Sequence, residues 1–434
     1  MKKINTSKVS GTEELLPKQQ ALFNQLKNKI DTTYQKHGFL NIETPHLERT
    51  EILLAKAGGD TEKQIYKVIK TAETTDESDQ ALRFDHTVPL ARYVIEHEND
   101  LTFPFKVSNI GINFRGERAQ KGRFREFYQC DVDIIGRNTL PIAYDADVIS
   151  TLLDTLKSFE LDTPIVARIS NRKILSGLIE SLNLTEKSKD IYSIIDHCEK
   201  VPPEKTEASF KEIGLSEANV KTFLDFINLA GEKSTVINYL NSLNIQNETF
   251  NSGISELDEV LSLLESQGLE SQFSADLKIV RGLDYYTGTV FEFVLPEFKN
   301  IGSICGGGRY ENLTKYFSDQ PFPGVGGSIG LTRLFYVLNE NNLLKNQVDS
   351  LLDFAIIPIT KNEFAYSANL AKELQQKNYK TTVVYSDKKL GDKITYASKI
   401  AKNGIVIGEE EVNISTKNLK AKNFETGETS EINL

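Results

Sequence analysis

Two apolar runs separated by a basic loop constrain the fold of this chain most strongly. Phe105–Phe114 and Phe127–Ile135 are apolar and partly alternating, which predicts a pair of antiparallel strands. Arginine presents a fixed fork of donors to phosphate oxygens, and an aromatic face can stack on a purine. The hairpin therefore predicts a site for a nucleotide polyphosphate, with a solvated charged loop as the plain alternative. Five arginines lie in or near the connection: Arg115, Arg118, Arg123, Arg125 and Arg137.

The negative net charge of the whole chain limits which kinds of nucleic-acid binding the basic loop can indicate. The 434 residues carry 51 Lys+Arg against 61 Asp+Glu, which gives a formal net charge of −10. A protein that coats nucleic acid without selectivity is normally broadly basic. The charge therefore argues against indiscriminate nucleic-acid binding and leaves local basic patches open.

The termini, cysteines and histidines point to a cytoplasmic protein. The N-terminal lysines are not followed by the apolar segment of a signal peptide, and no apolar run approaches the ~18–20 residues of a membrane-spanning helix. Cys130, Cys198 and Cys305 are far apart, which predicts three buried, reduced thiols. The five histidines do not have metal-ligand spacing, so we expect no metal site built from protein ligands alone.

Changes in the residue pattern along the chain predict its domains. Segment 172–248 is a run of helical patterns separated by acidic linkers, which predicts a helical insertion in a core formed by residues 1–171 and 249–338. A polar linker at 339–350 follows. Residues 352–408 then alternate strand, helix, strand, helix and strand, which predicts parallel strands with crossover helices in a separate α/β domain over 351–434.

Two glycine-rich segments lie near the end of the expected core. We expect strands at Lys278–Val280, Thr289–Leu295 and Gly302–Cys305, with the glycines of 306–308 after the last of them. Neither glycine-rich segment matches a Walker A loop or a dinucleotide-binding fingerprint. The glycines of 324–330 are interpreted as close backbone packing or ligand approach at the start of a helix.

Polar side chains in two further segments are candidates for a binding site. Asp85 and Thr87 would share a face of an extended segment, where they suit an ammonium group, although a helix N-cap is an equally good explanation. Gln129, Asp131 and Asp133 alternate onto one face of an apolar run. Polar groups are costly to bury there without partners, so this face is either the floor of a site or an exposed edge.

Taken together, these segments resemble the histidyl-tRNA synthetase family of class II aminoacyl-tRNA synthetases over nearly the whole chain. The resemblance implies an α+β class II catalytic core, with an antiparallel sheet and flanking helices, a helical insertion and a C-terminal α/β anticodon-binding domain. The three class II motifs are matched by Gly38–Pro45, Phe114–Gly136 and Gly324–Leu334, and the two histidine-specific signatures by Arg281–Tyr286 and Gly306–Tyr310.

The resemblance implies ATP-dependent ligation of L-histidine to tRNA(His) through a histidyl-adenylate, with Mg²⁺ as cofactor and a homodimeric assembly. Arg115 and Arg281 would be catalytic, holding the α-phosphate where charge grows in the transition state. The implied ATP-binding residues are Arg115, Glu117, Arg123, Phe127 and Arg333. The implied histidine-binding residues are Asp85, Thr87, Gln129, Asp133, Arg281, Tyr285 and Tyr286.

Contacts with tRNA are expected in two places. Residues 388–402 hold five lysines against one acid, which suits phosphate contact, with a solvated helix face as the alternative. The candidates for tRNA contact are Gln120, Lys121, Lys388, Lys389 and Lys393.

A catalytically silent relative is the main alternative. The regulatory subunit of ATP phosphoribosyltransferase shares the family's fold, but such relatives generally lack the anticodon domain and have eroded signatures, both of which are intact here. A module that senses uncharged tRNA normally adjoins an effector, for which the chain leaves no room.

Overall fold

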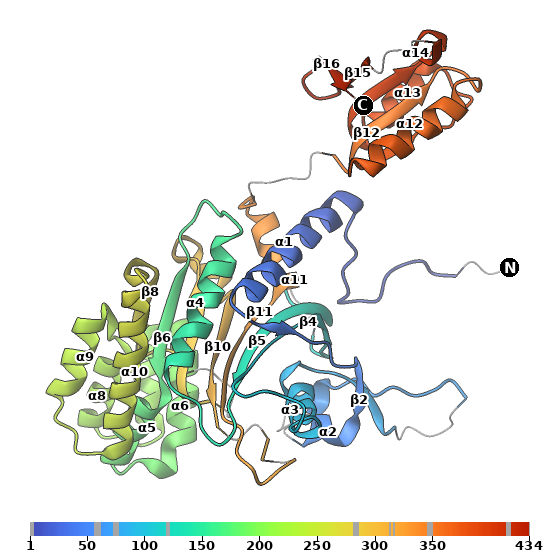
Figure 1. Cartoon of the computed structure of the whole chain (residues 1–434). Coiled ribbons are helices and arrows are strands. Elements are labelled where there is room, and N and C mark those ends of the chain that lie inside the picture. The colour runs from blue at the N-terminus through green and yellow to red at the C-terminus, as the bar shows by residue number, and fades with distance from the viewer. Residues whose placement is uncertain are drawn as a thin grey trace. The chain divides into compact units, whose positions relative to one another are not determined.

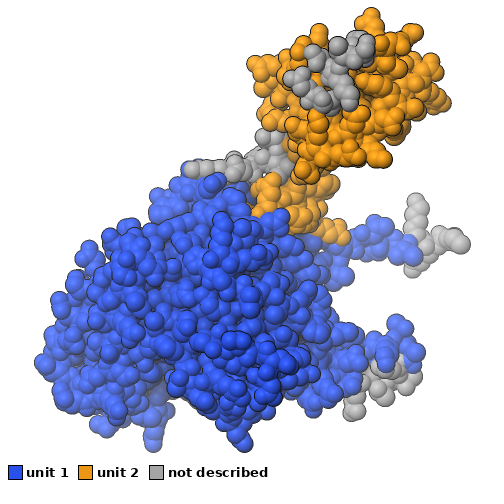
Figure 2. Space-filling model, in the orientation of Figure 1, with its two compact units in different colours: residues 1–13, 27–345 blue, residues 14–26, 346–434 orange. Residues whose placement is uncertain are grey.

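The computed structural model describes residues 4–55, 62–72, 78–118, 122–280, 286–311, 314–315, 317–344, 350–413 and 418–433. The chain forms two compact units, one of residues 1–13 and 27–345 and the other of residues 14–26 and 346–434 (Figure 2). Across the described residues, none of the helices has the length and apolar character needed to span a membrane.

The first unit is built on a nine-stranded sheet. Its strand order, β1-β4-β5-β11-β10-β9-β6-β8-β7, is antiparallel except for the β1–β4 and β6–β8 pairs. The hairpin predicted from the two apolar runs is confirmed, because β4 and β5 pair antiparallel along their whole lengths. The strands are β1 (Leu40–Asn41), β4 (Phe105–Phe114), β5 (Glu126–Ile135), β11 (Gly324–Ile329), β10 (Cys305–Tyr310), β9 (Tyr286–Val294), β6 (Val166–Asn171), β8 (Phe273–Asp276) and β7 (Ala230–Gly231).

Both glycine-rich segments are strands at the centre of this sheet, and Gly330 then directly precedes the helix α11 (Leu331–Glu340), so the close backbone packing and the helix start expected at 324–330 are both found. A Cβ on Gly307 would lie 2.0 Å from the carbonyl oxygen of Gly326, and one on Gly327 would lie 2.6 Å from the Leu152 side chain. Glycine is therefore required where β10, β11 and the helix α4 (Ala143–Lys157) pack together.

Two further strand predictions were wrong in position. The strand expected at 278–280 lies earlier, at β8, and the strand expected at 302–305 begins at Cys305 and continues through the glycines. The strand expected at Thr289–Leu295 is confirmed as the greater part of β9.

Segment 172–248 is mainly helical, as predicted. Figure 1 shows its helices gathered at the β6–β8 end of the sheet. The next helix, α10 (Glu248–Ser266), crosses α5 closely, because a Cβ on Gly177 would lie 2.3 Å from the backbone nitrogen of Phe250. The helices of the segment are α5 (Arg172–Ser181), α6 (Ser188–His197), α7 (Pro203–Glu212), α8 (Glu217–Ile227) and α9 (Lys233–Ser242).

The remaining elements of the first unit pack beside β4 and β5. Figure 1 shows α2 and α3 on the β4 side, together with the small β2–β3 sheet. Leu90 and Val94 of α3 pack with Phe105 and Val107 of β4, which fixes the start of this helix beside the sheet. These elements are α2 (Thr50–Leu54), α3 (Thr87–Glu96), α11 (Leu331–Glu340), β2 (Leu47–Arg49) and β3 (Gln80–Leu82), and the helix α1 (Pro17–Lys36) runs through both units.

The second unit confirms the predicted α/β alternation. In its five-stranded sheet, ordered β13-β12-β14-β15-β16, the strand β12 pairs parallel with both β13 and β14. The antiparallel β15–β16 hairpin was not anticipated. Its elements are β12 (Leu352–Pro358), α12 (Phe364–Gln376), β13 (Thr381–Val383), α13 (Leu390–Ala397), β14 (Ala401–Ile407), α14 (Glu409–Asn413), β15 (Asn418–Asn423) and β16 (Thr429–Asn433).

Candidate active site

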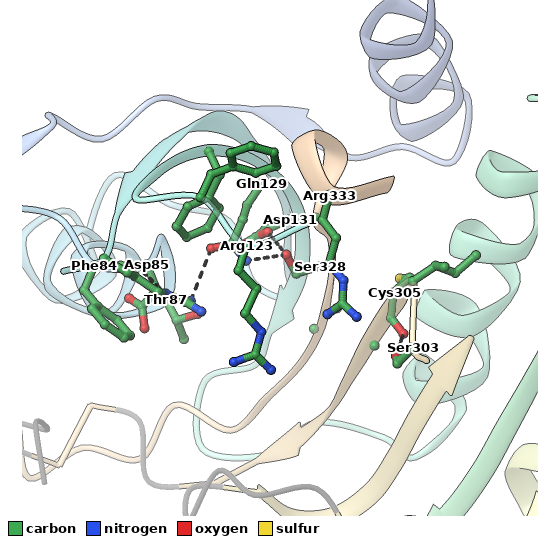
Figure 3. A pocket seen from close by; sticks show the side chains of 18 of the residues that line it. Phe84, Asp85, Thr87, Arg123, Gln129, Asp131, Ser303, Cys305, Ser328 and Arg333 are labelled. Carbon is green, nitrogen blue, oxygen red and sulfur yellow. Dashed lines mark hydrogen bonds between the residues drawn. The ribbon is translucent and has the colours of Figure 1, made fainter. Parts of the chain in front are cut away.

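A cavity of about 550 Å³, lined by both polar and apolar side chains, opens over the middle of the nine-stranded sheet. Its walls come from the start of α3, from β5, β9, β10 and β11, and from α11 (Figure 3). Arg281 and Tyr285 lie outside the described residues, as do Gln120 and Lys121. The structure brings together these residues that were expected to bind ATP or histidine: Asp85, Thr87, Arg115, Glu117, Arg123, Phe127, Gln129, Asp133, Tyr286 and Arg333.

The floor of the cavity is one face of β5. Alternate residues of a strand point to the same side, so Phe127, Gln129, Asp131 and Asp133 all line the cavity. Asp131 and Asp133 are 5% and 7% exposed. Of the two expectations for this strand face, the structure shows the floor of a cavity and not an exposed edge, and Asp131 lies there although it was not among the expected binding residues.

The Gln129 side chain is held by partners at both ends of its amide. Its Oε1 accepts a hydrogen bond of 2.9 Å from Nδ2 of Asn113, and its Nε2 donates one of 2.7 Å to Oγ of Ser328. The Ser328 hydroxyl in turn donates to Oδ1 of Asp131. Figure 3 shows Gln129, Asp131 and Ser328 meeting at the back of the cavity.

Asp133 is bound by a residue that the sequence did not suggest as a ligand. The hydroxyl of Tyr310 donates a 2.8 Å hydrogen bond to Oδ1 of Asp133. Burial raises the pKa of the Asp133 carboxyl well above its usual value, and the charge of Asp131 raises it further, while the Tyr310 hydrogen bond opposes both. Tyr310 is the last residue of the Gly306–Tyr310 signature. Its place in that signature was the only feature of the sequence that could have identified it as a site residue.

Arg115 lies between two aromatic rings at the Phe127 end of the cavity floor. Its guanidinium carbon is 4.4 Å from the ring centroid of Phe84 and 5.1 Å from that of Phe127. Its Nε donates a 3.3 Å hydrogen bond to the carbonyl oxygen of Phe84. The rings hold the guanidinium through cation–π attraction, and its Nη2 donates a 3.5 Å hydrogen bond to Oε1 of Gln129.

Two more arginines lie at another wall of the cavity. Nη1 of Arg123 is 3.5 Å from Oε2 of Glu117, and Nη2 of Arg333 donates a 2.9 Å hydrogen bond to the carbonyl oxygen of Ile301. Burial lowers the pKa of the Arg333 guanidinium, and the nearby charge of Arg123 lowers it further. Two like charges that disfavour each other suit an anionic ligand that neutralises both.

Asp85 caps a helix, as one of its two interpretations predicted, and it also lines the cavity. Its Oδ1 accepts a 3.0 Å hydrogen bond from the backbone nitrogen of Val88, so it caps the start of α3. The same side chain lines the cavity next to Thr87. The cap uses one carboxylate oxygen, Oδ1, and fixes the side chain at the wall of the cavity.

A buried ion pair that sequence reasoning missed supports the site from behind. Arg309 of β10 is 3% exposed, and its Nη2 lies 2.7 Å from Oδ1 of the fully buried Asp145 in α4. The same guanidinium donates to the carbonyl oxygens of Leu140 and Pro141. Arg309 therefore joins a central strand to a helix start and does not reach the cavity.

The lysines expected to contact tRNA behave differently from one another. Lys388 and Lys389 are exposed just before α13. Lys393 is 2% exposed, and its Nζ donates hydrogen bonds of 2.9 and 3.2 Å to the carbonyl oxygens of Pro358 and Ile359. The expectation of a surface contact at Lys393 was wrong, because its ammonium is used inside the domain.

The three cysteines are free thiols that differ in burial. Cys130 and Cys305 are buried free thiols, as expected, whereas Cys198 is only partly buried. In the part of the chain that the structure describes, no group of three or more His, Cys, Asp or Glu residues is placed to hold a metal ion.

Comparison with known proteins agrees with this geometry. The family model described as histidyl-tRNA synthetase matches residues 11–334, and the one described as anticodon binding domain matches residues 353–434. A histidine–tRNA ligase of Clostridium tetani is 42% identical over 433 residues, covering 99% of this chain and 97% of the relative. One of Finegoldia magna is 39% identical over 435 residues, covering 99% of both chains.

Solved structures give the same assignment. A crystal structure of histidyl-tRNA synthetase from a Nostoc species has a TM-score of 0.90 and 35% identity, covering 99% of this chain and 97% of that one. A Bacillus halodurans structure, described as an ATP phosphoribosyltransferase regulatory subunit/histidyl-tRNA synthetase, has a TM-score of 0.77 at 21% identity. It covers 94% of this chain and 100% of that one, and at this identity it shows the fold alone.

Proposed function

The chain belongs to the histidyl-tRNA synthetase family, and we propose that the cavity over β5 carries out adenylation of L-histidine by ATP before transfer to tRNA(His). The protein is thus an enzyme that joins histidine to tRNA, and ATP is its second substrate. The observation that supports the location is the meeting, in one cavity, of arginines and aromatics at one end of β5 with buried carboxylates at the other.

The ATP end of the site lies at Phe127. Arg115, held flat between Phe84 and Phe127, is positioned to bind the α-phosphate, and Phe127 offers an aromatic surface to adenine. Arg123 and Arg333 suit the outer phosphates, because an anion relieves the repulsion between their charges. Charge grows on the α-phosphate oxygens in the transition state, so fixed cations here lower the barrier.

The amino-acid end of the site lies at Asp133. Asp85, Thr87 and Gln129 would receive the α-ammonium, and Asp133 would accept a hydrogen bond from one imidazole nitrogen. Tyr286, which lines the cavity, and Tyr285 would serve the other nitrogen, and Arg281 would approach the α-phosphate from this side. A site with two polar partners for one ring rejects aliphatic amino acids strongly, because they leave those partners unpaired.

Mg²⁺ would enter this site together with ATP. The Glu117 carboxylate lines the cavity beside Arg123, and one carboxylate plus substrate phosphates is an ordinary environment for this ion. When bound, the ion would neutralise phosphate charge.

The second unit and the assembly complete the proposal. We assign residues 351–434 to anticodon binding, 339–350 to a linker and 172–248 to a helical insertion in the catalytic core. We also propose a homodimer that works in the cytoplasm without a membrane. Leu40 and Leu47, which flank Thr44-Pro45, are 63% and 48% exposed, which supports an apolar contact surface there.

Histidine-dependent exchange between ATP and pyrophosphate tests the proposal. We expect exchange with histidine and none with leucine, and we expect Arg281→Ala to raise the adenylation barrier by about 3–4 kcal/mol. Removing residues from about 350 onward should spare exchange and weaken tRNA charging. Histidine binding without exchange would favour the regulatory alternative, and equal loss of both activities on truncation would contradict the division between the units.

A further inference from the structure

His86 is a buried histidine directly behind the floor of the cavity. It stands between Asp85 and Thr87 in the sequence and is 1% exposed. Its Nδ1 lies 3.3 Å from Oδ2 of Asp131, while neither ring nitrogen meets the geometry of a hydrogen bond. A buried polar ring with such a neighbour requires an explanation that adenylation by itself does not give.

The surroundings of His86 indicate which nitrogen carries its proton. Nη2 of Arg83 and Nε2 of His86 flank the same point above Gly111, at 2.3 and 3.4 Å from where its Cβ would be. Arg83 is 0% exposed, and its guanidinium can only donate. Among the described residues, neither of these two nitrogens has a hydrogen-bond partner, whereas Nδ1 of His86 lies beside the Asp131 carboxylate, which only accepts, so the ring proton is assigned to Nδ1.

The hydrogen bonds along the floor of the cavity have directions that start from Asp131. A carboxylate only accepts, so the Ser328 hydroxyl must donate its single proton to Asp131. Ser328 Oγ can then only accept, so the nitrogen end of the Gln129 amide must face it, as the structure has it. The carbonyl end consequently faces away from Ser328, where it accepts from Nδ2 of Asn113 at 2.9 Å and from Nη2 of Arg115 at 3.5 Å.

We propose that Asp131 and His86 are positioning residues that fix the orientation of the Gln129 amide, so that its carbonyl oxygen and not its NH₂ group faces the α-ammonium of the substrate. This rests on the proposed function, in which Gln129 receives that ammonium. A reversed amide would point two N–H donors at a cation, which repels it. Figure 3 shows the Gln129 amide joined to Ser328 by a dashed line, as this arrangement requires.

Orientation of the Gln129 amide can be distinguished from general structural support of the cavity by the choice of ligand. Only ligands that carry the α-ammonium should respond to the orientation of Gln129. The compound 3-(imidazol-4-yl)propionate keeps the ring and the carboxylate of histidine and lacks the ammonium. Comparing the two ligands on the same variants therefore separates orientation of the amide from general damage to the site.

The experiment measures KM for histidine, KM for ATP and Ki for 3-(imidazol-4-yl)propionate in ATP–pyrophosphate exchange. Asp131→Asn replaces an acceptor with a group that can donate, and Ser328→Ala removes the link to Gln129. We expect both to raise KM for histidine about tenfold to a hundredfold, the effect of losing one hydrogen bond to a charged group. The Ki of the analogue and the KM for ATP should not change.

A matched pair at His86 tests the direction of the proton. Asn at this position can place an N–H where Nδ1 was, and Leu cannot, so His86→Asn should keep most of the histidine affinity that His86→Leu loses. Asp147→Asn is the control, since its carboxylate bonds Lys106 at 2.8 Å outside the cavity.

Three results would overturn the inference while leaving adenylation intact. These are equal weakening of histidine and of the analogue, unchanged KM for histidine in Asp131→Asn, and identical behaviour of the two His86 variants. If Asp131→Asn does not fold, Ser328→Ala carries the same comparison. Absence of exchange by the unaltered enzyme would instead contradict the proposed function.

Discussion

Arg309 and Asp145 form a buried ion pair whose closest atoms, Nη2 and Oδ1, are 2.7 Å apart. The two residues are 164 positions apart in the sequence, and together they join β10 to the first turn of α4. Both side chains are almost completely removed from water. Each charge therefore depends on the other for its stability in the interior.

The first prediction concerns this pair. Arg309→Met should lower the free energy of unfolding of the enzyme by about 3–5 kcal/mol, because Asp145 is left buried without its cation. Denaturant unfolding followed by circular dichroism measures the effect. The double variant with Asp145→Leu should recover part of the loss, and a cost below about 1 kcal/mol for Arg309→Met would contradict this view of the pair.

Arg115 gives the second prediction. Arg115→Lys keeps the positive charge but loses the flat guanidinium that Phe84 and Phe127 hold. We expect kcat for ATP–pyrophosphate exchange to fall about 10²–10³-fold, as for other lost donors to a developing oxyanion. Unfolding measurements should show little change. A lysine variant with nearly full activity would mean that charge alone suffices.

The pH dependence of stability gives the third prediction, at Asp133. Because burial raises the pKa of this carboxyl in the folded chain, the folded state keeps a proton that the unfolded chain has released. That contribution to stability is fully present below the unfolded pKa and is lost as pH rises through the raised folded value. Asp133→Asn removes this loss.

The measurement is the free energy of unfolding of both proteins between about pH 4 and pH 8 without substrate. The variant should gain stability relative to the unaltered enzyme as pH rises, and its affinity for histidine should fall. A constant difference between the two proteins across this range would show that Asp133 does not titrate as described.

The fourth prediction separates the lysines near α13. Lys393→Ala should destabilise the second unit by about 1–3 kcal/mol, because two buried carbonyls lose their donor. Replacing the exposed Lys388 and Lys389 together with Ala should not change stability.

In charging assays the double variant should raise KM for tRNA and weaken its dependence on salt, because phosphate contacts release counterions. Exchange without tRNA should be unaffected. An unchanged KM for tRNA would place the contact surface of the second unit elsewhere.

Sequence reasoning succeeded where one physical signal dominated. Alternating apolar residues defined β4 and β5, and the strand–helix alternation defined the second unit, because burial of one face sets both patterns. The polar residues of β5 were found for the same reason. Their period of two placed them on one face, and the structure lines the cavity with them.

It failed where packing between distant segments decided the outcome. Glycine disfavours strands, so no strand was expected at 306–308 or 324–329, yet these glycines are needed in β10 and β11 because Gly307 faces the backbone of Gly326. Lysine is usually found at the protein surface, and the sequence around Lys393 gives no sign of its partners. The fold shows that Lys393 donates to two backbone carbonyls inside the domain. The partner of Arg309 could not be named without knowing that α4 crosses β10.

The placement of four cavity residues on one strand has an evolutionary consequence. Phe127, Gln129, Asp131 and Asp133 succeed one another along β5 at about 6.7 Å intervals. The residues proposed for the nucleotide and for the imidazole therefore belong to opposite ends of a single rigid element. A descendant could alter the amino-acid end by substitution near Asp133 without disturbing Phe127, so one half of the chemistry can be inherited unchanged while the other diversifies.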